Sequence, residues 1–182
     1  MNGLLKFSSL IDRINTRIGQ GAAWLMLIAV MISAGNAMIR YSFNISSNAW
    51  LEIQWYLFGA MVMLGAAYTL KMNEHVRVDV LYSHYGSKLR LWLDLIGGLV
   101  FLLPVTIIIG WLSWPLLANS FDLGETSGNP GGLIRWPARL MVPLGFFLLT
   151  LQGLSEIIKR IGALRGEIAL PSEDLRYEKP TQ

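Results

Sequence analysis

The sequence predicts an all-α integral membrane protein with four transmembrane helices. Hydrophobic residues make up 53% of its 182 residues and charged residues only 15%, whereas soluble domains carry about 25% charged residues. The charges are gathered between four long apolar runs, and a helix needs about 20 apolar residues to cross a bilayer. None of these runs alternates apolar with polar residues, so they favour helices over the strands of a membrane barrel.

The four predicted spans lie at about residues 20–40, 52–71, 92–115 and 136–158. The central residues of the first two spans carry no charge. The apolar run of the third span continues to Phe121, and we expect its end to leave the membrane near Pro115. Residues 1–162 are interpreted as a single four-helix membrane domain and residues 163–182 as a polar cytoplasmic tail.

The distribution of Lys and Arg predicts that both termini lie in the cytoplasm. Twelve of the 15 lie in the N-terminal segment, in the loop between the second and third spans, or in the tail. The opposite side has only Arg40, Arg135 and Arg139. Because cytoplasmic flanks retain Lys and Arg, this bias accounts for the net charge of +3 without a nucleic-acid partner.

Residues 4–18 predict an N-terminal interfacial amphipathic helix. Apolar side chains recur there at helical spacing, with Lys6, Asp12, Arg13 and Arg17 between them. Such a pattern is typical of a helix that lies on the surface of a membrane. In the alternative interpretation, this segment simply continues the first span into the cytosol.

The sequence predicts no enzyme activity, no cofactor and no metal site in this chain. It contains no cysteine, and its two histidines, His75 and His84, lie in the loop between the second and third spans. Transmembrane haem needs axial ligands that face one another across helices. Neither a compact metal-ligand spacing nor a catalytic nucleophile with its base is readable in the sequence.

Two carboxylates lie at the edges of predicted spans. Glu52 is at the outer edge of the second span, and Asp94 is near the inner edge of the third. Charge within a bilayer is costly and often marks function. Two interpretations stay open: both are ordinary helix-end carboxylates, or one of them pairs with a polar group of a partner subunit.

Small residues mark a narrow surface on the second span. Gly59 and Gly65 lie there together with Ala60, Ala66 and Ala67. Small side chains let another helix approach closely within a membrane. The approaching helix could belong to this chain or to another subunit.

Two longer stretches carry motifs of a known family. Residues 65–81, GAAYTLKMNEHVRVDVL, contain the pattern His75, Val76, Val78 and Asp79 after a small-residue run and a basic segment. Residues 131–161 enter the fourth span with Trp-Pro and contain Pro143 and Gly145 in a Pro-x-Gly-Phe motif. Both stretches resemble the small permease subunit (Q subunit, DctQ-like) of the tripartite ATP-independent periplasmic (TRAP) transporters.

The resemblance implies a multi-pass protein of the bacterial inner membrane that binds a much larger permease subunit. The whole importer is expected to work with a periplasmic solute-binding protein and to take up small organic acids by sodium symport. The resemblance also implies that this chain is a scaffold, against which the large subunit moves its substrate domain in an elevator-like cycle. The ion sites are expected on the large subunit.

The resemblance suggests a role for the stretch at residues 73–81. His75 and Asp79 are four residues apart, so in a helix they share one face and can form a hydrogen bond. The alternation of this stretch equally fits an extended segment, in which the two residues still share one side. Arg77 then points towards lipid headgroups. With these three residues, the candidate residues for a subunit interface or a structural motif are Glu52, Gly59, Gly65, Pro143 and Gly145.

Two alternative functions stay open at this point. One is the membrane-anchor subunit of a quinone-linked oxidoreductase, which also uses few helices. The other is a stand-alone small channel, which requires a polar stripe through at least one span. Only scattered polar residues are available for such a stripe, and most of them can bond to the helix backbone instead: Asn36, Gln54, Thr69, Thr106, Ser113 and Gln152.

Overall fold

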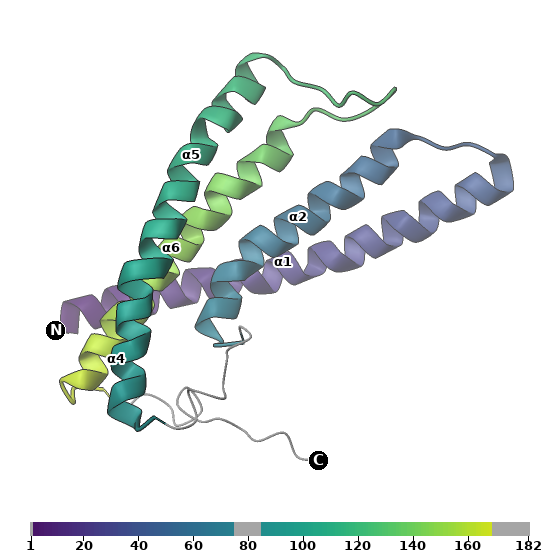
Figure 1. The fold of residues 1–182 in the computed structure, drawn as a ribbon. Helices are drawn as coiled ribbons and strands as arrows, with labels where there is room; N and C mark the ends of the chain where they lie inside the picture. The colour runs from purple at the N-terminus through teal and green to yellow at the C-terminus, as the bar shows by residue number, and fades with distance from the viewer. Residues whose placement is uncertain (1, 75–84, 169–182) are drawn as a thin grey trace.

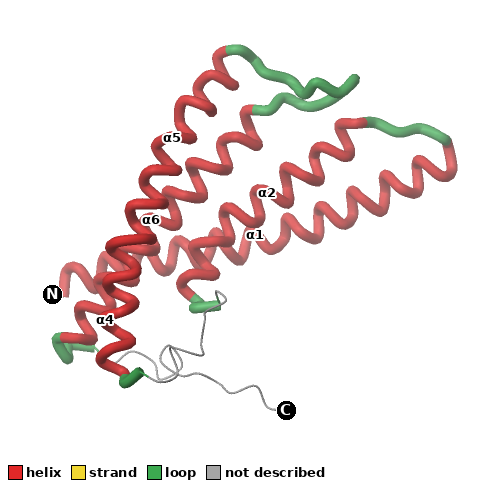
Figure 2. The backbone as a smooth tube through the Cα atoms, in the orientation of Figure 1, coloured by secondary structure: helices red, strands yellow, loops and turns green. Residues whose placement is uncertain are grey.

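The computed structural model describes residues 2–74 and 85–168 of the chain. Its helices are α1 (Asn2–Phe43), α2 (Asn48–Lys71), α4 (Ser87–Gly97), the π-helical segment η1 (Gly98–Leu102), α5 (Leu103–Asp122) and α6 (Trp136–Leu164). Figure 2 shows that helices make up almost all of the described backbone, and the described residues contain no β-strand. The predicted all-α class is confirmed.

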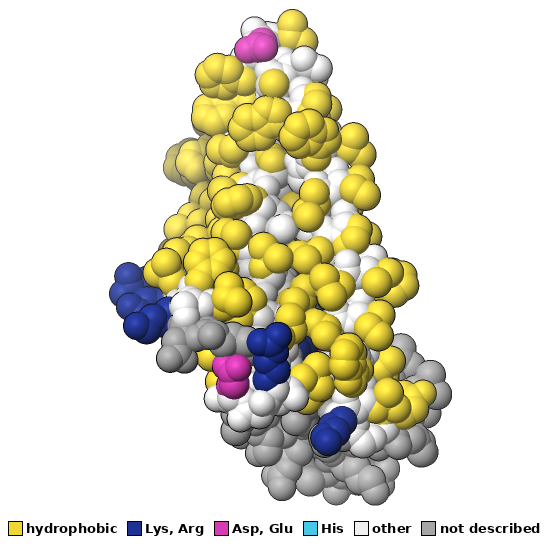
Figure 3. All heavy atoms as spheres, turned by 90° about the vertical axis from the view of Figure 1, so that its left-hand side faces the viewer, with side chains coloured by type: hydrophobic (Ala, Val, Ile, Leu, Met, Phe, Trp, Pro, Cys, Tyr) yellow, Lys and Arg dark blue, Asp and Glu magenta, His cyan; other side chains and the backbone are white. Residues whose placement is uncertain are grey.

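Four of the described helices are long and apolar enough to cross a membrane. They comprise Gly3–Phe43, Asn48–Lys71, Lys88–Asp122 and Trp136–Leu164. Figure 3 shows one face of the molecule, where hydrophobic side chains form a broad band and basic side chains gather towards one end. The prediction of four helices able to span a membrane is therefore confirmed, and each predicted span lies within one of them. The side of the membrane on which the termini lie stays a prediction.

The N-terminal segment and the first span form one continuous helix. Residues 4–18 are helical, and α1 runs on to Phe43 without a break, as the alternative interpretation has it. With 42 residues, α1 is about 63 Å long, about twice the thickness of a bilayer core. A location of residues 4–18 at the membrane surface stays a prediction.

Residues in the left-handed backbone conformation follow the C-terminal ends of the helices. Asn44 (φ 55°) follows α1, and its N–H donates to the carbonyl of Arg40 at 3.0 Å. Asn73 (φ 58°) follows α2, and Gly124 and Gly166 follow α5 and α6. Asn and Gly adopt this conformation at low cost. The local sequence therefore determines where these helices end.

The third spanning helix contains a wider π-helical turn at η1. Pro104 is the second residue after η1, and in a regular α-helix its ring would clash with the carbonyl of Val100. The wider turn relieves this clash and leaves the helix continuous. The helix also continues past Pro115 to Asp122, beyond the point where we expected the chain to leave the membrane.

Helix α6 lies at the centre of the molecule. It contacts all the other described helices, and 39% of its most apolar stretch is buried, compared with 6% for α2. Glycines permit this packing: a Cβ atom on Gly145 would lie 2.8 Å from the backbone oxygen of Met63 in α2. On Gly153, a Cβ atom would lie 3.0 Å from the side chain of Leu102.

The helices form two hairpins that diverge from their common end (Figure 1). One hairpin consists of α1 and α2, and the other of α5 and α6. The beginning of α1 crosses the C-terminal half of α6, where Ser8 and Ser155 are in contact. Residues near the two ends of the described chain therefore lie at the same end of the molecule, as an even number of spans requires.

Candidate functional site

Buried polar side chains join α1 to α6 where the two helices cross. The hydroxyl oxygens of Ser8 and Ser155 lie 2.7 Å apart, and Asn15 Nδ2 donates to Gln152 Oε1 at 2.8 Å. All four side chains are at most 2% exposed. We call this group, together with Asp12, the polar seam. Because each bond joins residues more than 130 positions apart, the seam fixes the register of α1 on α6.

Asp12 is the charged member of the polar seam. Its Oδ1 accepts hydrogen bonds from Gln152 Nε2 at 2.8 Å and from Ser155 Oγ at 2.7 Å. Its Oδ2 lies 3.2 Å from Lys159 Nζ. The carboxylate thus has three donors from α6, which offset the cost of its partial burial.

Ion pairs extend the polar seam to α4. Glu156 pairs with both Lys159 and Arg160, and Arg160 Nε lies 3.3 Å from Asp94 Oδ2. Asp94, which could have bound another subunit, is therefore paired within its own chain. Alternating positive and negative groups let this cluster hold its charges away from bulk water.

Glu52 joins α2 to the loop between α5 and α6. Its carboxylate accepts hydrogen bonds from Asn129 Nδ2 at 2.9 Å, from the backbone N–H of Leu133 at 2.7 Å, and from Ser127 Oγ. These three uncharged donors satisfy the hydrogen-bonding capacity of the carboxylate inside this chain. Glu52 thereby holds the loop against the start of α2.

The predicted small residues fall into two groups. Pro143 and Gly145 are buried within α6, and Gly145 is the point of close approach to α2. By contrast, a Cβ atom on Gly59 or Gly65 would have no neighbour within 4 Å. The surface that contains Gly59 and Gly65 is therefore open in the described structure.

The remaining candidates, His75, Arg77 and Asp79, lie outside the described residues. Their suggested hydrogen bond and their role in assembly stay predictions. No group of His, Asp and Glu in the described part of the chain could hold a metal ion.

Sequence reasoning missed the polar seam. The apolar pattern of residues 4–18 predicted a helix on the membrane surface and gave no packing partner. In the structure, Leu4, Phe7, Leu10 and Ile14 are exposed, and the side that packs on α6 carries the buried Ser8 and Asn15. A signal was present, because Ser8, Asp12 and Asn15 recur at spacings of four and three, as do Gln152, Ser155 and Lys159. Two polar stripes of matching helical period can face one another.

Comparisons with known proteins identify the family. Residues 22–163 match the family model of the DctQ component of the tripartite ATP-independent periplasmic transporters. This range includes all four predicted spans except the first two residues of the first span. The chain belongs to this family. The family is a transporter component of the inner membrane, so the resemblance to small TRAP permeases, the location in the inner membrane and the absence of an enzyme function are confirmed.

A curated relative is similar to part of the chain. It is the C4-dicarboxylate TRAP transporter small permease protein DctQ of Vibrio cholerae, 30% identical over 110 residues. The similarity covers 59% of this chain and 47% of the relative, so the chain matches about half the length of that protein. No solved structure matches the chain significantly.

Proposed function

We propose that this DctQ-family chain is the scaffold subunit of a TRAP importer. It holds a larger permease subunit, which carries the transport site and the ion sites, and it works with a periplasmic solute-binding protein. The proposed substrates are small organic acids, with uptake driven by a sodium gradient. The name of the Vibrio relative makes C4-dicarboxylates the first substrate class to test.

The observation that carries this proposal is that three of the polar side chains that could form a stripe through a span bond instead to the backbone of their own helix. Gln54 donates to the carbonyl of Trp50 at 2.8 Å, Thr69 to that of Gly65 at 3.2 Å, and Ser113 to that of Gly110 at 2.8 Å. Each bond stays within one helix, so these groups are satisfied locally. This supports a subunit that supplies structure, with the solute path in another polypeptide.

The polar seam supports the same role. Hydrogen bonds and ion pairs from Asp12 and Glu156 hold α1, α4 and α6 in one arrangement. A subunit whose helices are held in one arrangement can serve as the fixed platform against which a larger subunit moves.

Affinity purification of the full chain from native membranes, followed by mass spectrometry, tests the proposal. We expect a multispan permease to co-purify in stoichiometric amount. Purification of the chain alone would contradict a scaffold role. A flavin or iron–sulfur partner would favour the oxidoreductase anchor instead.

Uptake assays test the substrate class and the driving force. Cells that lack this chain should lose uptake of a labelled C4-dicarboxylate, and restoring the gene should recover it. Replacement of external sodium by potassium should abolish the recovered uptake. Equal uptake in both salts would contradict sodium coupling. It would not contradict the scaffold role, which the purification experiment tests.

The Asp79→Ala variant tests the suggested role of the stretch at residues 73–81. We expect weaker co-purification with the large permease and weaker uptake, with normal insertion into the membrane. The measurement is the amount of permease recovered per amount of this chain. Wild-type recovery together with wild-type uptake would remove Asp79 from the proposed interface.

A further inference from the structure

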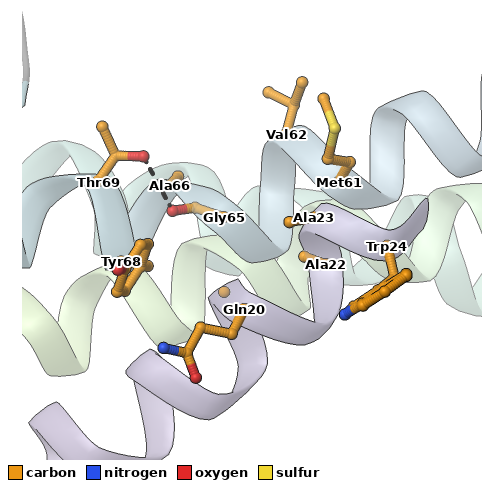
Figure 4. A pocket seen from close by; sticks show the side chains of 11 residues that line it. Gln20, Ala22, Ala23, Trp24, Met61, Val62, Gly65, Ala66, Tyr68 and Thr69 are labelled. Atoms are coloured by element: carbon orange, nitrogen blue, oxygen red, sulfur yellow. Dashed lines mark hydrogen bonds between the residues drawn. The ribbon is translucent and has the colours of Figure 1, made fainter. Parts of the chain in front are cut away.

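A hollow of about 800 Å³ lies between α1 and α2. Figure 4 shows Trp24, Met61 and Val62 towards one end and Tyr68, Thr69 and Gln20 towards the other. The hollow is open to the side because small residues line it: a Cβ atom on Gly65 would meet nothing within 4 Å. Its volume is within the range of about 300–1,000 Å³ that is usual for ligand sites.

Basic side chains lie just beyond the Thr69 end of this hollow. Lys71 follows Thr69 by two residues, and its ammonium group donates to Thr16 Oγ1 at 2.6 Å, which bridges α2 and α1. Arg17 precedes Gln20 by one helical turn, and Arg13 precedes Arg17 by another. Arg13 and Arg17 are exposed.

These basic groups have unused capacity to bind an anion. Within residues 2–74 and 85–168, no carboxylate forms an ion pair with Arg13, Arg17 or Lys71. An ammonium group has three donors, and Lys71 uses one of them on Thr16. An apolar hollow and unpaired cations therefore adjoin one another on the α1–α2 hairpin.

We propose that this hollow binds an acyl chain of an anionic phospholipid, with the lipid phosphate against Lys71 and Arg17. A phospholipid joins an apolar chain and a negative group in one molecule, as the hollow and its cations require. Juxtamembrane Lys and Arg attract anionic lipids, and a long basic side chain can reach the headgroup level.

A second hollow on the same two helices provides an internal contrast. It has a volume of about 550 Å³ and is lined by residues that include Ala29, Ser33 and Gly59. The neighbouring turns, residues 25–37 and 50–63, contain no Lys or Arg. This second hollow should therefore not prefer an anionic headgroup.

Native mass spectrometry of the full-length chain in detergent tests the proposal. The protein is mixed with equal amounts of phosphatidylglycerol and phosphatidylcholine that carry the same acyl chains. We expect phosphatidylglycerol to be retained preferentially, and each of the Lys71→Gln and Arg17→Gln changes to reduce this preference by about fivefold. Arg40→Gln, at the other end of α1, is the charge control and should leave the preference unchanged.

Two glycine substitutions locate the site. Gly65→Leu fills the first hollow, and Gly59→Leu is its matched control in the second, since neither added side chain begins against a neighbour. We expect only Gly65→Leu to reduce phosphatidylglycerol retention. Circular dichroism confirms that both variants keep their helices, and a variant that does not is replaced by Gly65→Val with Gly59→Val.

Three results would overturn the proposal. One is equal retention of the two lipids by the wild-type chain, and another is an equal effect of the Gly65 and Gly59 substitutions. The third is unchanged lipid retention in Gly65→Leu together with loss of the large permease, which would assign the hollow to a protein helix.

Discussion

At the crossing of α1 and α6, the side chains that join the helices are buried. At the opposite end of the molecule, the hydrogen bonds between Glu52 and the α5–α6 loop are partly exposed. Gln152 and Ser155 are fully buried at the crossing. At the far end, Glu52 binds a loop through donors such as Asn129, which is exposed. Water competes for exposed hydrogen bonds, and an unmade buried bond is costly. The crossing should therefore dominate stability, and the far end should respond locally.

The largest loss of stability is expected for Asp12→Ala at the crossing. Removal of this carboxylate leaves Lys159 without one of its two anions and leaves Gln152 Nε2 and Ser155 Oγ each with one bond fewer. We expect the free energy of unfolding to fall by about 3 kcal/mol. Denaturant unfolding in detergent measures it.

Asp122→Ala is the control for Asp12→Ala. Asp122 is exposed, and no ion pair or hydrogen bond of its side chain occurs within the described part of the chain. Its removal should change the free energy of unfolding by less than about 0.5 kcal/mol. Equal losses of unfolding free energy in Asp12→Ala and Asp122→Ala would mean that the contacts at the crossing do not dominate stability.

A smaller loss is expected for Gly145→Ala, which tests the packing of α6 on α2. The added Cβ atom would lie 2.8 Å from both the Cβ and the backbone oxygen of Met63, so the helices must shift. We expect destabilisation by about 2 kcal/mol, as for other overpacked sites. The same substitution at Gly59, which faces open space, should be tolerated. A larger loss of thermal stability in Gly59→Ala than in Gly145→Ala would contradict the observed packing.

Thr150→Val should have a modest effect. Thr150 Oγ1 donates to Thr106 Oγ1 across the α5–α6 pair at 3.0 Å, and such bonds between membrane helices contribute about 0.6 kcal/mol. Ser113→Ala is the control, because that hydroxyl bonds only within its own helix. A loss as large as that of Asp12→Ala would remove the distinction between the charged crossing and neutral helix contacts.

The smallest overall effect is expected for Glu52→Ala. The backbone N–H of Leu133 loses its acceptor at 2.7 Å, so hydrogen exchange at Leu133 should become faster. Exchange in α6 around Gln152 should stay unchanged, because the polar seam does not depend on this loop. Faster exchange at both places would show that the two ends of the molecule are coupled.

The sequence predicted the position of some small residues in the helix packing but not of others. Pro143 and Gly145 belonged to a recognised motif, and the structure places both in the helix packing. Gly59 and Gly65 looked equally suited to packing but face an open groove. Small residues permit close approach without determining which partner approaches, so sequence alone could not separate these two pairs.

The sequence by itself determined the four helices, because a bilayer leaves an apolar segment of about 20 residues little alternative to a helix. It also determined where helices end, through residues such as Asn44 and Gly124. Only the tertiary structure decided that Asp12 meets Lys159 and that Glu52 meets Leu133. Those contacts join residues far apart in the chain, and helical period sets which residues share a face but not which helix that face meets.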